Sequence, residues 1–338
     1  MKKITSTTDS RNITVVTGGR LHMGFFDLHG GVGRKFGSIG LSLTEPNLKI
    51  SVSTSEKLRV FGTPSVADST LEKASSIAQV LLEKLNITNA ITIDIVQHIS
   101  EHSGLGSGTQ LALAIGAAIR KLHHLNLTTE QIALLTGRGG RSGIGIAAFD
   151  KGGLLIDGGR TTRINATSSH LKSARVPPLI ARYDFPSDWR ILLIFDSSQP
   201  GIHGENELLA FSQLPEFPEN LAAHLCRYVL MQAMPALVEH DLTAFGNSIQ
   251  ALQCHVGDYF APAQGGRYAS QLVGSVLHYL DDIGVACFGQ SSWGPTGFAI
   301  FENDTEAEKL LKQLKMKFTN ENLSWKICSA RNHGAELT

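Results

Sequence analysis

Apolar and polar positions alternate with two different periods along this chain, and the two periods predict a mixture of strands and helices. In the first third, runs rich in β-branched residues predict strands at residues 13–17, 48–54, 57–61 and 91–96. Before the last of these strands, apolar residues three and four apart predict a helix that ends near Leu85 and is capped by a side chain at 68–70. This part of the chain is therefore expected to form a mixed sheet.

One strand leads through a glycine-rich loop into a long helix. The predicted strand at 91–96 is followed by a connection and then by Ser-Gly-Leu-Gly-Ser-Gly-Thr-Gln at 103–110. An apolar-rich helix from Leu111 to about His123 comes next. A shorter helix, a second glycine cluster and a short apolar strand are expected at 129–135, 137–145 and 154–157.

The composition changes near residues 177 and 178, which are both proline, and the chain beyond them is mostly helical. Helices are predicted at 218–238, 241–256, 267–283 and 305–317. Strands are predicted at 190–195, 285–288, 297–302 and 325–330. We therefore expect an α+β fold with two lobes, residues 1–176 and residues 177–338.

The bulk composition excludes several classes of protein. The 338 residues are 42% hydrophobic, and 30 basic residues balance 30 acidic ones, so no net charge would draw the protein onto nucleic acid or an anionic membrane. We expect no membrane span, because no run of about 18 apolar residues is evident, and no leader peptide, because the first residues are polar. The four cysteines lack the spacing of a zinc site. A location in the reducing cytosol fits best.

The first glycine cluster has the features of a phosphate-binding loop. Ser103, Gly104, Leu105, Gly106, Ser107, Gly108 and Thr109 stand directly before a helix. Such a loop offers backbone N–H groups, hydroxyl donors and the positive end of the helix dipole to an anion. The alternative is a tight structural turn. The loop has neither the lysine of a Walker motif nor the spacing of a dinucleotide fingerprint.

Gly-Leu-Gly-Ser at 104–107, followed by a helix, resembles the phosphate loop of the galacto-, homoserine, mevalonate and phosphomevalonate (GHMP) kinase superfamily. The resemblance implies that superfamily's two-lobed fold. Ser100 stands where these kinases usually have proline, and Gly145 stands where their Ser-Gly-x-Asp motif has the aspartate. Glycine cannot act as a base, so phosphoryl transfer to an alcohol is disfavoured.

Longer motifs, spread over most of the chain, resemble a non-kinase branch of the superfamily, the β-ribofuranosylaminobenzene 5′-phosphate synthases. They lie at 20–27, 137–145, 152–159, 177–184 and 289–296. The resemblance implies condensation of 4-aminobenzoate with phosphoribosyl pyrophosphate, with loss of carbon dioxide and pyrophosphate, in methanopterin biosynthesis. It also implies Mg²⁺ with the pyrophosphate and a homodimer.

Arginines near the glycine clusters suit this chemistry, because the 5′-phosphate, the pyrophosphate and the carboxylate must all be held. The candidates are Arg20, Arg34, Arg138, Arg141 and Arg160. For any one of them, a solvated or ion-paired surface role is the alternative. Ser142, in the second cluster, is a further candidate anion contact.

Three residues are candidate catalytic contacts: His22, Asp27 and Arg141. His22 lies between apolar neighbours, so a hydrogen-bonded core histidine is its alternative role; a buried structural carboxylate is the alternative for Asp27. Asp157 ends an apolar strand and is a weak candidate ligand for Mg²⁺.

A turn between two predicted strands carries the remaining candidates, Gln290, Ser291, Ser292 and Trp293. The indole face could stack on the aryl ring while the serines bind anions; the alternative is a packed turn. His203 follows another apolar strand and is a weaker candidate. Two other functions stay open: an ATP-dependent small-molecule kinase, and a ligand sensor without catalysis.

Overall fold

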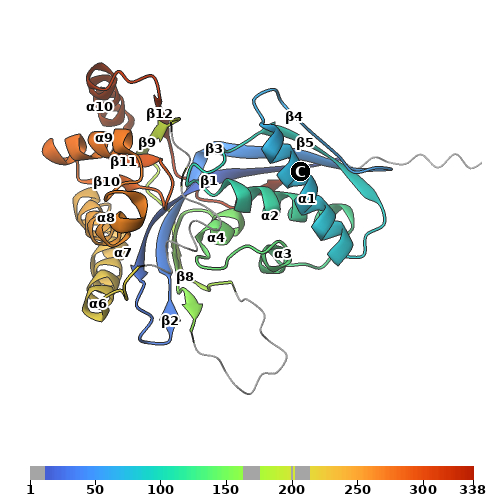
Figure 1. Ribbon diagram of the computed structural model, residues 1–338, viewed down its shortest axis with the longest axis horizontal. Helices are drawn as coiled ribbons and strands as arrows, with labels where there is room; N and C mark the ends of the chain where they lie inside the picture. The colour runs from blue at the N-terminus through green and yellow to red at the C-terminus, as the bar shows by residue number, and fades with distance from the viewer. Residues whose placement is uncertain (1–11, 163–175, 199–200, 202–213) are drawn as a thin grey trace, which may run out of the picture.

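The computed structural model describes residues 12–162, 176–198, 201 and 214–338. In the first lobe, a seven-stranded sheet is covered on one face by helices (Figure 1). The strands run in the order β13–β1–β3–β5–β4, and β6 pairs with both β3 and β8. They are β1 (Asn12–Asp27), β3 (Gly37–Ser55), β4 (Arg59–Gly62), β5 (Ala90–Gln97), β6 (Leu154–Asp157), β8 (Leu179–Tyr183) and β13 (Glu336–Leu337). The helices are α1 (Asp68–Lys84), α2 (Ser107–Leu122), α3 (Thr129–Leu135) and α4 (Ile144–Asp150).

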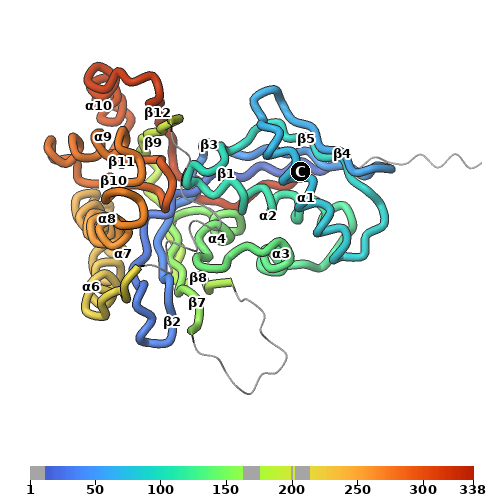
Figure 2. The backbone as a smooth tube through the Cα atoms, in the orientation of Figure 1, coloured from blue at the N-terminus to red at the C-terminus, as the bar shows by residue number. Residues whose placement is uncertain are grey.

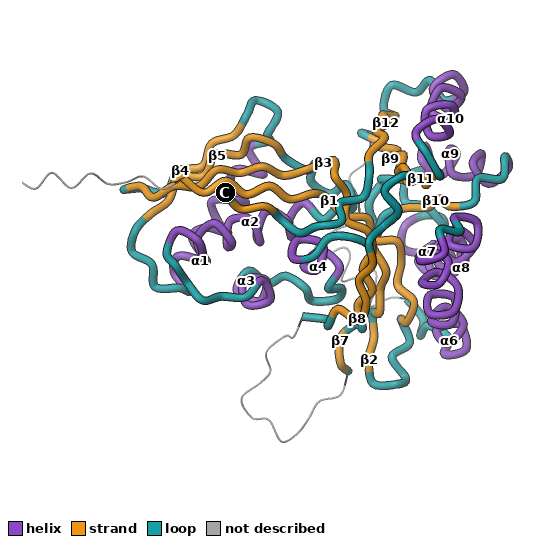
Figure 3. Tube along the Cα trace, turned by 180° about the vertical axis from the view of Figure 1, so that it is seen from behind, coloured by secondary structure: helices purple, strands orange, loops and turns teal. Residues whose placement is uncertain are grey.

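Two long antiparallel strands connect the lobes. β1 and β3 have 16 and 19 residues, and β3 pairs with β6 near its start and with β5 near its end. From behind, β1 passes between the first lobe's helices and the helices of the second lobe (Figure 3). A small ribbon of β2 (Arg34–Lys35) and β7 (Arg160–Thr161) extends from the same region.

The second lobe is a four-stranded antiparallel sheet, ordered β10–β11–β9–β12, with helices packed around it (Figure 2). β9 reads as an unbroken apolar run because both its faces are buried: Leu192 and Ile194 pack among α9 and α10, while Ile191 and Leu193 join the main core. The strands are β9 (Arg190–Asp196), β10 (Cys287–Gln290), β11 (Gly297–Phe301) and β12 (Leu323–Cys328). The helices are α6 (Glu219–Tyr228), a π-helical turn η1 (Val229–Ala233), α7 (Met234–Glu239), α8 (Leu242–Gln264), α9 (Gln271–Asp282) and α10 (Asp304–Lys317).

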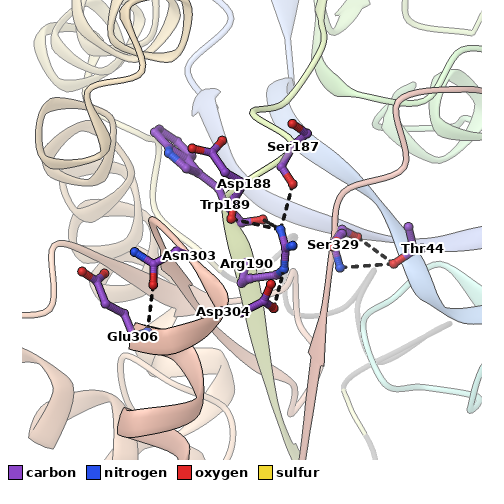
Figure 4. Close-up of polar contacts among 9 residues, drawn as sticks. All are labelled: Thr44, Ser187, Asp188, Trp189, Arg190, Asn303, Asp304, Glu306 and Ser329. Atoms are coloured by element: carbon purple, nitrogen blue, oxygen red, sulfur yellow. Dashed lines mark hydrogen bonds and ion pairs between the residues drawn. The ribbon is translucent and has the colours of Figure 1, made fainter.

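Polar side chains fix where the second sheet and its last helix begin (Figure 4). Asn303 caps α10 by accepting a hydrogen bond from the Glu306 N–H at 3.0 Å. Arg190, the first residue of β9, donates to Asp304 Oδ1 at 2.6 Å and to the Ser187 carbonyl at 2.8 Å. The start of β9 is thereby tied to the first turn of α10.

Most predicted elements are present, and the differences have local causes. The strand at 154–157 and the helix at 129–135 have the predicted bounds. The predicted cap of α1 is wrong: Ala67 occupies the N-cap and provides no side-chain hydrogen bond. The helix after the first glycine loop begins four residues earlier than predicted, at Ser107. Helix α4 was not predicted: it begins inside the second glycine cluster and, unlike α3, has no side-chain cap to mark its start.

Two observations bear on the expected division at residues 176 and 177. Strand β8 lies beyond that boundary and pairs with β6 in the first lobe's sheet. Strand β13, at the carboxyl end, pairs with β1. The first lobe therefore contains chain from both sides of the expected boundary.

By length and hydropathy alone, the stretch Glu219–Glu239 would suffice to cross a membrane. The sequence analysis expected no such stretch. One helix of this kind is weak evidence for a membrane span, because the core helix of a soluble protein can meet the same criterion. In this fold, 33% of its apolar window is buried. A π-helical turn interrupts the stretch at Val229–Ala233.

Candidate functional site

The glycine loop leads directly into helix α2, which begins at Ser107. Gly104 and Gly106 have φ angles of 79° and 83°, which lie in the region that favours glycine. Gly106 is the N-cap of α2, and no acidic side chain lies in the first helical turn. This helix start can therefore accept an anion without repulsion from a neighbouring carboxylate.

The turn after β10 packs directly onto the glycine loop. Ser291 Oγ donates to the Gly104 carbonyl at 2.9 Å and accepts from the His22 backbone N–H at 3.1 Å. The side chain of Arg20 also donates to the Gly104 carbonyl, and its backbone N–H donates to the Leu105 carbonyl at 2.9 Å. A Cβ at Gly104 would lie 2.3 Å from the Ser291 carbonyl oxygen. The two lobes thus meet at the glycine loop, and Gly104 has no room for a side chain.

Cationic side chains gather at the start of α2. A Cβ at Gly108 would lie 3.4 Å from Arg138 Nη1 and 3.6 Å from Lys73 Cε. Burial lowers the pKa of Arg138, and its Nε has no hydrogen-bond partner within the described residues. Lys73 Nζ pairs with Glu101 at 2.8 Å. Arg138 is therefore a half-buried cation beside the phosphate loop, as an anion site requires.

Other predicted anion contacts have structural partners. Ser103 Oγ donates to the Ser100 carbonyl at 2.8 Å. Ser142 Oγ donates to Asp157 at 2.9 Å. These two hydroxyls shape the glycine clusters. Nothing in their geometry directs them at a ligand.

Asp157 has a structural role in this fold. Its carboxylate is fully buried and accepts hydrogen bonds from Ser38, Ser142, Gly143 and Gly159 at 2.6 to 2.9 Å. Burial raises the pKa of this carboxyl despite the four donors. Because its oxygens are already occupied, the weak prediction of a Mg²⁺ ligand is corrected to a residue that anchors the second glycine cluster. Among the described residues, no group of three or more His, Cys, Asp or Glu side chains could hold a metal.

The carboxyl end of β1 lies away from the glycine loop. Asp27 is seven residues from Arg20, roughly 20 Å along a strand, and its Oδ1 accepts from the His29 and Gly30 N–H groups at 3.0 Å. Arg34 donates to the carbonyls of residues 158 and 159 at 2.6 and 2.5 Å. Arg160 donates to the Gly140 carbonyl at 3.1 Å. These contacts hold together the β2–β7 corner, so the predicted catalytic position of Asp27 is not supported by the geometry.

A second, aromatic cavity lies beside the loop, between β1, α8 and the turn after β10. His22 lies two residues beyond Arg20, about 7 Å along β1. Burial, reinforced by Arg20, lowers the pKa of His22 to about 3, so the ring is neutral. The rings of Phe260 and Trp293 have centroids 4.3 Å apart. The lining residues are His22, Gly24, Phe25, Leu252, Gln253, Val256, Gly257, Phe260, Gln264, Arg267, Gln290, Ser292 and Trp293.

The sequence analysis predicted His22, Gln290, Ser292 and Trp293 but missed the wall of the cavity formed by α8. Gln253 is buried, and its amide hydrogen-bonds the backbone of both β1 and β10. A glutamine at a buried position of an apolar helix was a signal that could have identified it. His203 lies outside the described residues.

Comparisons with known proteins agree with this architecture. Residues 72–153 match the GHMP kinases N terminal domain, and residues 233–320 match the GHMP kinases C terminal model. Homoserine kinase from Cytophaga hutchinsonii superposes with a TM-score of 0.68 at 17% identity, covering 98% of each chain. Mevalonate diphosphate decarboxylase from Staphylococcus aureus superposes with a TM-score of 0.66 at 13% identity, covering 97% of this chain and 98% of the other. At such identities, these two structures show the fold alone.

Two curated relatives are much more similar in sequence. The β-ribofuranosylphenol 5′-phosphate synthase of Archaeoglobus fulgidus is 36% identical over 95% of this chain and 98% of its own. That of Methanocaldococcus jannaschii is 36% identical over 87% of this chain and 91% of its own. This chain therefore belongs to the β-ribofuranosylphenol 5′-phosphate synthase family, within the GHMP kinase superfamily.

Proposed function

We propose that this protein forms a bond between C1 of phosphoribosyl pyrophosphate and a ring carbon of a para-substituted benzoate. That ring carbon is the one that carries the carboxylate. Carbon dioxide and pyrophosphate leave, and a β-ribofuranosyl arene 5′-phosphate is formed for methanopterin biosynthesis. The relatives' names specify a phenol product, so the para group is a hydroxyl or, as the sequence analysis expected, an amine.

The observation that supports this proposal best is the adjacency of two sites with different chemistry. The start of α2, with Arg20 and Arg138, suits a phosphorylated sugar. The cavity beside it has the aromatic side chains of Phe25, Phe260 and Trp293, which suit an aryl ring. A reaction between a sugar phosphate and an arene requires that their two binding sites lie next to each other.

The proposed mechanism depends on position and charge. Arg138 and the amino end of α2 stabilise the departing pyrophosphate, and C1 of the sugar gains oxocarbenium character. The electron-rich ring attacks from the face opposite the leaving group, which inverts the configuration and yields the β product. Loss of carbon dioxide then restores the aromatic ring. Arg141, in the second glycine cluster, is proposed to contact the phosphates with Arg138.

Magnesium is proposed to arrive with the pyrophosphate. Glu101 and Ser107 line one small cavity beside the loop, but Glu101 already accepts from Lys73 and Ser69 at 2.8 and 2.9 Å. Asp157 is likewise occupied. The described side chains therefore do not fit a dedicated magnesium site, and no step is assigned to the metal.

The test is incubation with phosphoribosyl pyrophosphate, Mg²⁺ and carboxyl-labelled 4-hydroxybenzoate or 4-aminobenzoate, with labelled carbon dioxide and the aryl riboside measured together. Both products are expected in equal amounts. Arg138→Ala should raise the KM for the sugar substrate, while Arg59→Ala, an exposed arginine on β4, is the matched control. Absence of both products from folded protein, with both acids, would overturn the proposal.

Consumption of ATP in the presence of a small alcohol would instead support the kinase alternative. Gly145 argues against that alternative, because no side chain at this position can act as a base.

The homodimer and the cytoplasmic location stay predictions. Leu230, Met231 and Val238 are exposed apolar side chains on the helical stretch 219–239. Light scattering coupled to size-exclusion chromatography measures the mass in solution and tests the dimer.

A further inference from the structure

Most polar groups in the wall of the aromatic cavity are already paired. Gln253 donates to the carbonyls of Met23 and Gln290 at 2.6 and 3.1 Å and accepts from the Gln290 N–H at 2.8 Å. Gln290 in turn donates to the Ser292 carbonyl at 2.8 Å and accepts from the Ala269 N–H at 2.6 Å. These glutamines therefore hold the wall together and have little capacity left for a ligand.

The charged residue of the cavity wall is also engaged. Arg267 forms a two-pronged ion pair with Asp258, at 2.7 and 2.9 Å, and its third nitrogen lies 3.4 Å from Cys254 Sγ. A carboxylate bound firmly by an arginine would resist leaving as carbon dioxide, because the ground state would be stabilised more than the transition state. The paired state of Arg267 is thus compatible with a substrate that loses its carboxylate.

His22 differs from these residues. The residue is 3% exposed and lines the cavity, and its buried Nε2 has no hydrogen-bond partner in the described part of the chain. Phe25 packs against the ring with centroids 4.5 Å apart, which fixes its orientation. A buried, unpaired nitrogen costs about 1–3 kcal/mol, so a ligand that pairs with it recovers that energy. The neutral ring pairs with a neutral polar group better than with a carboxylate.

We propose that His22 Nε2 accepts a hydrogen bond from the para hydroxyl or amino group of the benzoate and thereby selects the substrate and orients its ring. This inference rests on the proposed function. Because the hydroxyl and the carboxyl group are at opposite ends of the ring, binding of the hydroxyl to His22 turns the carboxyl-bearing carbon away from His22. Benzoates whose para group has no proton to donate are excluded from this contact.

The contact also assists the reaction. When the ring carbon forms its bond to C1 and the bond to pyrophosphate breaks, the ring becomes cationic and the para hydroxyl becomes more acidic. His22 takes that proton as the para oxygen donates electrons to the ring. The bond to carbon dioxide then breaks, its electron pair restores the aromatic ring, and the proton returns to the para oxygen. No net proton is gained or lost at His22.

Calorimetric titration of the unmodified protein tests the proposal directly, with 4-hydroxybenzoate, 4-aminobenzoate, 4-methoxybenzoate and benzoate as probes, each with and without magnesium pyrophosphate. Near neutral pH all four acids are carboxylates, so they differ only in the para group. The hydroxy and amino acids should bind about tenfold more tightly than the other two, as one buried hydrogen bond allows. Equal affinity for the methoxy and hydroxy acids, or no binding of any of the four, would overturn the inference.

His22→Phe keeps an aromatic ring of similar size but removes the acceptor. The preference for 4-hydroxybenzoate over benzoate should disappear, while the affinity for benzoate is retained. His255→Phe, on the exposed face of α8, is the matched control and should keep the preference. A preference that survives in His22→Phe would refute the role of His22. Should that variant fail to fold, the ligand series with the unmodified protein decides.

The outcomes separate this inference from the proposed function. A para-group preference that depends on His22, without release of carbon dioxide from any acid, would support the contact and refute the synthase reaction. Release of carbon dioxide with equal efficiency from the hydroxy and methoxy acids would support the synthase and refute the contact.

Discussion

Acidification is expected to destabilise the native protein through His22 well before its surface carboxylates are protonated. The pKa of His22 is lowered from 6.5 to about 3 because its ring is buried and lies near Arg20. In the unfolded chain the ring takes up a proton as the pH falls through 6.5, but the folded state keeps it neutral. The unfolded state then binds more protons, so stability is present above that pH and is lost as the pH falls toward 3.

The size of the effect follows from the shift. Between about pH 7 and pH 5, the folded His22 stays neutral while its unfolded counterpart gains about one proton. Because pH 5 lies about 1.5 units below the unfolded pKa of 6.5, the free energy of unfolding falls by on the order of 2 kcal/mol at pH 5. That is a measurable fraction of the stability of an ordinary domain, which is about 5–15 kcal/mol.

Urea unfolding followed by circular dichroism measures this difference. The unmodified protein should lose on the order of 2 kcal/mol more than His22→Phe between the two pH values. His255→Gln, an exposed histidine on α8, is the control and should lose as much as the unmodified protein. The same loss in His22→Phe and the unmodified protein would show that His22 titrates normally and would refute its burial in the neutral form.

Three further predictions concern the glycine loop and its surroundings. Gly104→Ala should lower the melting temperature and the activity, because its Cβ would lie 2.3 Å from the Ser291 carbonyl, whereas Gly140→Ala, with nothing within 4 Å, should leave the melting temperature unchanged. Arg138→Gln should raise the KM for the sugar substrate about tenfold or more, with little effect on the KM for the benzoate. Steady-state kinetics with each substrate varied in turn measure both values. Asp157→Ala should lower the free energy of unfolding in urea by about 3 kcal/mol, because two buried backbone N–H groups lose their acceptor. The magnesium concentration that the remaining activity requires should not change. A higher requirement would show that Asp157 is a magnesium ligand.

Local patterns were sufficient for the elements that form from their own residues. Helix α3 has a capping box at Thr128 and Gln131, and its bounds were predicted correctly. The apolar run of β9 was recognised because both faces of the strand are buried. By contrast, β1 was recognised only at its start, since bulges at three positions break its alternation with β3.

The candidate site divides in the same way. The glycine loop and the helix after it were predicted from the sequence, because glycines before an apolar helix are a local arrangement that determines its own geometry. The roles of single side chains were not. From the sequence, Asp27 was a candidate catalytic contact and Asp157 a candidate Mg²⁺ ligand. In the structure, Asp27 accepts hydrogen bonds from a turn at the far end of β1, and Asp157 is enclosed by four donors.

The sequence by itself thus determined the glycine loop, the family motifs and most of the helices, because each depends on residues close together along the chain. Only the tertiary structure decided that the turn at Ser291 closes over Gly104, residues 187 positions apart, and that α8 completes an aromatic cavity around His22. The physical reason is burial: whether a polar group binds a ligand or holds the fold depends on which partners the rest of the chain brings to it.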